Sequence, residues 1–137
     1  MSSRVEIVRR AFPAFADRDV NALEALMTPD VEIQVASPAL GGKPPIVRRL
    51  HYAGHAGLEA WLREVREDFT DLSLEARHVE EIGDAVLVLG TVAYESAAGG
   101  GGGITIGWVC HFAGDRVARI ETYWRWDAAR AACGAPV

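Results

Sequence analysis

The stretch ITIGWVCHF, residues 104–112, decides the fold because two sets of side chains alternate along it. A period of two predicts a β-strand with one buried face. Which of Trp108 and His111 faces the interior decides whether this strand supplies a cavity wall or a titrating group. The two sets are Ile104, Ile106, Trp108, Cys110 and Phe112 on one face, and Thr105, Gly107, Val109 and His111 on the other.

The turn after this strand sets its pairing with the next strand, and a change of one residue exchanges the two faces. A strict two-residue turn, Gly114-Asp115, puts His111 on the same face as Trp124. A three-residue turn over 113–115 puts Trp108 there instead, with His111 on the opposite face. We expect the three-residue turn because it gathers the bulky apolar side chains on one face.

Regular patterns extend outward from this strand in both directions. Amphipathic helical spacing runs from Val5 to Phe15, from Val20 to Met27 and from Leu58 to Phe69. The segment from Ser37 to Gly54 is rich in proline and glycine and is predicted to be a loop. The predicted strands are 31–36, Leu72–Ile82, Ala85–Ser96, Ile104–Ala113 and Arg116–Trp126, followed by a helical turn over Ala128–Ala132.

This order of elements predicts an α+β fold, in which three helices pack on one face of a curved, cone-shaped antiparallel sheet.

The chain has 137 residues, of which 50% are hydrophobic, so we expect one domain over 1–137. The formal net charge of −5 argues against a nucleic acid as the main partner. No apolar run reaches the roughly 18 residues of a membrane span. The first ten residues contain no apolar signal core, so we expect a cytoplasmic location without membrane attachment.

The residue types that usually bind metals are scattered. Cys110 and Cys133 do not have the spacing of a metal site, and the four histidines include no pair at helical i,i+4 spacing. We therefore expect two free thiols, no metal and no cofactor.

Several short motifs resemble those of the nuclear transport factor 2-like superfamily, and within it the SnoaL-like polyketide cyclase and ketosteroid isomerase-like domains. The resemblance covers nearly the whole chain and implies a cone whose open end accepts a small hydrophobic molecule. It also implies a homodimer through the outer sheet face, where Val109, His111, Arg119, Glu121 and Tyr123 are expected to be exposed. The motifs are HYAGHAGLEAWL (51–62), FTDL (69–72), GDAV (83–86) and GDRVARIETYW (114–124).

The catalytic residues of the best-known family members are not found at the matching positions of this sequence. The isomerase-like members use an aspartate base, a tyrosine and an aspartic acid, and these positions fall on Val35 or Ser37, near Phe12, and on Trp108. The cyclase members use a histidine and an aspartate, which fall on Trp108 and Thr122. Neither set is present in this sequence.

Two groups of candidate site residues remain. Asp71 lies where some dehydratase members place a catalytic residue, His78 shares the parity of apolar neighbours, Tyr94 lies late in a strand, and His111 depends on the register. These four are the catalytic candidates. The predicted pocket-lining residues are Phe12, Phe15, Val35, Trp61, Trp108, Cys110, Ile120, Thr122 and Trp124.

Three functions are open at this point. The first is an isomerase, dehydratase or cyclase that works by acid–base chemistry on a small apolar substrate with residues of its own. The second is a non-catalytic protein that binds a small hydrophobic molecule. The third is a dimeric interaction protein with a filled cavity. A carboxylate or histidine in an open cavity favours the first function, a purely apolar cavity the second, and no cavity the third.

Overall fold

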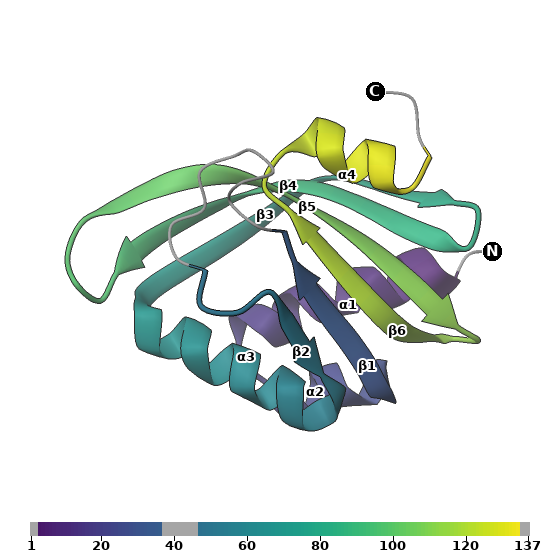
Figure 1. Cartoon of the computed structure of the whole chain (residues 1–137), viewed down its shortest axis with the longest axis horizontal. Coiled ribbons are helices and arrows are strands. Elements are labelled where there is room, and N and C mark those ends of the chain that lie inside the picture. Colours follow the sequence, from purple (N-terminus) through teal and green to yellow (C-terminus); the bar gives the residue numbers. More distant parts are fainter. Residues whose placement is uncertain (1–2, 37–46, 135–137) are drawn as a thin grey trace.

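The computed structural model describes residues 3–36 and 47–134 of the chain, which form four helices and one six-stranded sheet (Figure 1). The helices are α1 (Ser3–Ala16), α2 (Val20–Ala25), α3 (Gly54–Asp68) and α4 (Trp126–Ala132). The strands are β1 (Met27–Val35), β2 (His51–Ala53), β3 (Phe69–Ile82), β4 (Ala85–Ser96), β5 (Gly101–Ala113) and β6 (Arg116–Tyr123). Among the described residues, no helix has both the length and the apolar character needed to cross a membrane.

The strands lie in the order β2-β1-β6-β5-β4-β3. Strands β3 to β6 form an antiparallel meander, as expected, and β2 is antiparallel to β1. The pairing of β1 with β6 is parallel, so the sheet is mixed and not wholly antiparallel. The first strand thus lies beside the last, and α3 connects the two ends of the sheet.

Two strands begin earlier than predicted, since β1 begins at Met27 instead of residue 31 and β3 begins at Phe69 instead of Leu72. Three further differences each have a local reason. The predicted loop Ser37–Gly54 contains β2, whose three residues are too few to show a period of two. The part of this loop over 37–46 lies outside the described residues. Strand β6 ends at Tyr123 instead of Trp126, because α4 already begins at Trp126. Strand β5 begins at Gly101, in a run of glycines that carries no side-chain pattern.

Helices α1, α2 and α3 cover one face of the sheet, as predicted, and α4 lies on the opposite face (Figure 1). The larger core fills the space between the first three helices and the inner sheet face. A smaller core lies under α4 on the outer face, where Ala129 packs near Leu87 and Val109. The expected exposure of Val109 was therefore wrong, because Val109 is 0% exposed beneath this helix.

The turn between β5 and β6 has two residues, not the three that were predicted. A β-bulge in β6 nevertheless gives the side chains the orientation that was predicted. Phe112 pairs with Val117 across Gly114-Asp115, but His111 pairs with Arg119, which leaves Ala118 as an extra residue. A bulge of one residue exchanges the faces of the strand beyond it. Cys110 consequently lies opposite Ile120, as the favoured register required. Trp108 faces inward and His111 faces outward.

The packing of α4 on the sheet depends on the absence of a side chain at Gly107. A Cβ atom built there would lie 2.6 Å from the Cβ of Ala129, far inside a normal contact. The outer face of β5 can therefore accept the helix only where the strand has a glycine.

We predict that Gly107→Ala lowers the free energy of unfolding by about 1–3 kcal/mol, because the added methyl overpacks the contact with α4. Urea denaturation measures this change. Gly103→Ala is the matched control, since a Cβ there has its nearest contact at 3.6 Å, and it should be neutral or stabilising. Adding Ala129→Gly to Gly107→Ala should restore part of the loss. A Gly107→Ala variant as stable as the wild type would contradict the proposed contact.

Candidate functional site

The main cavity lies between α3, the end of α1 and the inner face of the sheet, and has a volume of about 110 Å³. Its walls are mostly apolar and come from both ends of the chain. Val35 and Thr122 line it from the parallel pair β1 and β6, and Ile104 and Trp108 line it from β5. Trp61 of α3 lies along it as well. The bulge in β6 positions this wall, because it turns Thr122 to the same face as Trp108.

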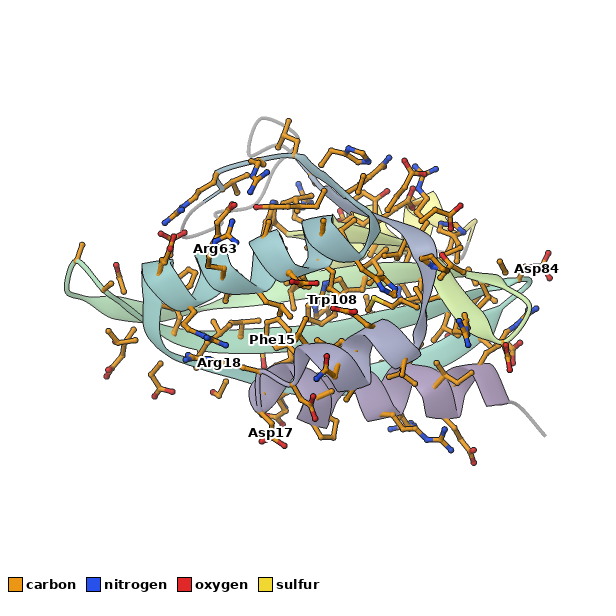
Figure 2. All side chains as sticks on the ribbon, turned by 90° about the horizontal axis from the view of Figure 1, so that it is seen from below. Phe15, Asp17, Arg18, Arg63, Asp84 and Trp108 are labelled. Atoms are coloured by element: carbon orange, nitrogen blue, oxygen red, sulfur yellow. The ribbon has the colours of Figure 1, made fainter. Side chains whose placement is uncertain are left out.

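A second cavity of about 70 Å³ adjoins the first beneath α1, and its lining is wholly apolar. The side chains of Phe15, Trp61, Leu74 and Trp108 line both cavities and so separate them. Figure 2 shows the labelled Phe15 and Trp108 in the interior between the helices and the sheet. The rings of Phe15 and Trp61 have centroids 5.5 Å apart. An aromatic partition therefore divides the interior into an outer and an inner chamber.

All nine residues predicted to line a pocket lie along one or both of these cavities. Val35, Thr122 and Trp124 line the outer chamber, Phe12, Cys110 and Ile120 line the inner one, and Phe15, Trp61 and Trp108 line both.

The outer chamber contains a buried carboxylate at one end. Glu64 of α3 is only 7% exposed, and its carboxylate accepts hydrogen bonds from the guanidinium of Arg49 and from the Tyr52 hydroxyl, the latter at 2.7 Å. The Arg49 guanidinium also lies over the Tyr52 ring, 4.7 Å from its centroid. The ionised form of Glu64 is thus held by two donors and one positive charge.

These contacts move the pKa values of Glu64 and Tyr52 in opposite directions. The hydrogen bonds from Arg49 are the largest cause that lowers the pKa of the Glu64 carboxyl, and burial opposes them. Burial raises the pKa of the Tyr52 hydroxyl to about 12, and its hydrogen bond to Glu64 adds to the rise. Near neutral pH, Glu64 is therefore charged and Tyr52 is neutral.

A second ion pair lies beside the first at this end of the chamber. Arg48 donates to Glu67 at 3.1 Å and to Asp68 at 2.6 Å, so that the segment before β2 is held against the last turn of α3. Among the described lining residues, Arg48 and Arg49 face the two carboxylates of Glu64 and Asp68. The charges along the chamber are therefore already paired within the protein.

Sequence analysis did not identify the charged end of the cavity. Glu64 lies three residues after Trp61, on the flank of the apolar face of α3, and that spacing was the only available signal. Arg48 and Arg49 fall in the segment predicted to be a loop, where no periodicity places a side chain.

Thr122 carries a hydroxyl without a hydrogen-bond partner on the cavity wall. The residue is 4% exposed, and its Oγ1 has no partner in the structure. Its neighbours across the sheet are Trp108 and Val35, which are both apolar at this point. The nearby indole of Trp124 is already engaged, because its Nε1 donates to the carbonyl of Ala36 at 2.8 Å.

Two of the four catalytic candidates lie on the outer surface of the sheet. His111 contacts Glu121 at 3.3 Å on the outer face, away from both cavities. The parity argument for a partly buried His78 was wrong, because a bulge at Arg77 turns it outward, where its exposed side chain contacts Glu80 at 2.7 Å.

The other two candidates do not line the two chambers either. Tyr94 packs its ring edge-on against Phe69, with centroids 5.5 Å apart. Asp71 is exposed and lines a third cavity, of about 130 Å³, together with Arg18. None of the four candidates therefore lies along the aromatic chambers.

Metal-binding and thiol chemistry have little support in the described part of the chain. It contains no group of three or more histidine, cysteine, aspartate or glutamate side chains that could hold a metal ion. Cys110 and Cys133 are free thiols. Burial raises the pKa of the Cys110 thiol to about 12, so Cys110 is a weak nucleophile in the inner chamber.

Comparison with known proteins gives a consistent family. Among curated proteins, none matches this sequence significantly. Similar solved structures include an NTF2-like protein of unknown function from Burkholderia pseudomallei K96243, with 24% identity, coverage of 98% of this chain and 100% of that one, and a TM-score of 0.77. TerC, co-crystallised with polyporic acid, gives the same four values. A proposed SnoaL-like polyketide cyclase from Jannaschia sp. CCS1 is 18% identical over 98% of this chain and 94% of that one, with a TM-score of 0.74.

The family model agrees with these likenesses in fold. The model of the SnoaL-like domain matches residues 8–120, which extend from α1 into β6 and include most of both chambers. This chain therefore belongs to the SnoaL-like domain family.

Proposed function

We propose that the protein binds a small, mostly apolar, ring-containing molecule in the outer chamber. The observation that carries this proposal is the aromatic cavity itself, which is lined by Trp61, Trp108 and Trp124. Ligand sites are typically concave, apolar and supplied with a few polar groups, which here are Thr122 and the Glu64 cluster. A dry cavity of about 150 Å³ takes up benzene, so the outer chamber of about 110 Å³ suits one ring, and a second ring would extend into the neighbouring cavity of about 70 Å³.

A protein with the same fold gives independent support for this choice. TerC was co-crystallised with polyporic acid, and it aligns over nearly the whole of both chains. Its identity to this chain is 24%, so the ligand is a guide to a useful probe and not an assignment.

One observation favours the alternative of an acid–base enzyme, namely the Glu64 carboxylate along the chamber. General acid–base catalysis works best when the pKa of the group lies near the working pH. The pKa of Glu64 is lowered by Arg49, and that of Tyr52 is raised to about 12, so both are displaced in the unfavourable direction. Binding without chemistry therefore has the stronger support.

We predict that naphthalene binds to the protein and raises its melting temperature, because apolar surface is buried in the native state alone. Calorimetric titration measures the affinity, and polyporic acid serves as a larger second probe. A protein that binds neither compound and shows no shift in melting temperature would contradict the proposed function.

Trp108→Ala tests whether the ligand occupies the chambers, because it removes part of the partition and joins them. We predict a shift in preference towards the larger probe. We also predict a loss of stability below the roughly 3–5 kcal/mol that is usual for a packed aromatic side chain. Trp126→Ala is the matched control, since Trp126 lies along neither cavity, and it should leave both affinities unchanged. A full stability loss with no change in preference would identify Trp108 as plain core.

We further propose that the chain forms a homodimer through the part of the outer sheet face that α4 leaves open. This surface consists of Gln34, His111, Arg119 and Glu121 and is bordered by Tyr123, which packs against the small core under α4, and this mixture of aromatic, polar and charged side chains suits an interface. Arg119 donates to Gln34 at 2.8 Å and pairs with Glu121 at 2.8 Å, which keeps the surface ordered. The Arg119 Nε is buried and has no hydrogen-bond partner.

Sedimentation equilibrium should give twice the monomer mass of 14.8 kDa at micromolar concentration. Arg119→Glu should dissociate the dimer, because it places like charges beside Glu121 in both subunits. Arg63→Glu, a reversal on the exposed surface of α3, should leave the dimer intact. A monomer at every concentration would exclude this interface.

A further inference from the structure

The unpartnered hydroxyl of Thr122 calls for a physical explanation. Burying a hydroxyl without a hydrogen bond is unfavourable, so such groups are rare in folded proteins. Elsewhere in the same sheet Thr105 donates to the carbonyl of Trp124 at 2.8 Å. Thr122 instead lies between Trp108 and Val35, where its side chain has no polar neighbour.

The position of Thr122 connects this orphan group to the ligand site. Its side chain lines the outer chamber, and the two cross-strand neighbours line it too. The Oγ1 is buried and has no hydrogen-bond partner. Rotation about the single Cα–Cβ bond moves the hydroxyl among three staggered positions, so it can turn towards a ligand in the chamber without any movement of the backbone.

The other groups of the chamber restrict the charge and the polar groups that a ligand can have. The charges of Arg49 and Glu64 satisfy each other, and those of Arg48 and Asp68 do the same. A ligand with a net charge would lose hydration without gaining an unpaired counter-charge. Aromatic walls favour a ring, and a hydroxyl that can both donate and accept suits a single oxygen.

We propose that Thr122 hydrogen-bonds an oxygen atom of the ligand, so that the chamber selects neutral aromatic compounds with one hydroxyl or carbonyl group. This inference rests on the proposed binding function and specifies the class of its ligand. It also gives the orphan hydroxyl a role, since a ligand oxygen would recover the hydrogen bond that the protein does not supply.

The test compares 2-naphthol with naphthalene by calorimetric titration in the wild type and in Thr122→Val. The quantity of interest is the ratio of the two dissociation constants, because the general effect of the hydroxyl on solubility cancels between the two proteins. A net hydrogen bond of about 0.5–1.5 kcal/mol corresponds to roughly two- to thirteenfold. We expect the preference for 2-naphthol to fall by about this factor in Thr122→Val and to persist in Thr122→Ser.

Thr91→Val is the matched control, because Thr91 lies on β4 and lines neither chamber, and its ratio should equal that of the wild type. Without ligand, Thr122→Val should unfold at the same urea concentration as the wild type or a higher one. A lower urea midpoint would mean that the hydroxyl has a partner inside the protein and would overturn the inference.

The two proposals fail in different ways. Binding of naphthalene with an unchanged ratio in Thr122→Val would contradict the role of Thr122 and leave the binding function standing. Binding of neither compound by any variant would contradict both proposals.

Discussion

The pairing of β5 with β6 is the constraint on which the interior of this protein depends. The two-residue turn at Gly114-Asp115 would by itself put His111 inside, and the extra residue Ala118 reverses that outcome. With the bulge, Trp108 and Thr122 share the inner face and form one wall of the outer chamber. The same bulge sends His111 and Glu121 to the outer face. A single inserted residue thus decides which side chains line the chambers and which lie on the outer face of the sheet.

The charged end of the outer chamber shows how the fold tolerates a carboxylate in an apolar interior. Burial alone would raise the pKa of Glu64, but hydrogen bonds from Arg49 and Tyr52 outweigh it. The arrangement also joins two parts of the chain, because Arg49 and Tyr52 come from the segment around β2 and Glu64 comes from α3. Because the Arg49 side chain is 48% exposed, this pair is better understood as a contact that fixes the segment in place than as a large source of stability.

The two chambers differ in chemistry, and that difference limits the reactions available to them. The inner chamber has only apolar walls, and its one thiol has a pKa raised to about 12. The outer chamber has charged groups that already satisfy one another and one hydroxyl, that of Thr122, that has no partner. A site of this kind recognises shape and a single polar atom more readily than it moves protons. The proposed function of selective binding follows from this distribution of polar groups.

The sequence by itself determined the order of the elements and most of the chamber walls. Period-two patterns around Trp108 and helical spacing around Trp61 indicate which side chains are buried, because apolar side chains face the core. Tertiary structure alone decided three matters. A bulge such as that at Ala118 has no sequence signature, since it depends on how two strands match in length. The pairing of Arg49 with Glu64 joins segments that the local pattern describes separately. The lack of a hydrogen-bond partner for the Thr122 hydroxyl can be seen only in the folded protein, because its neighbours come from β1 and β5, which lie on either side of β6.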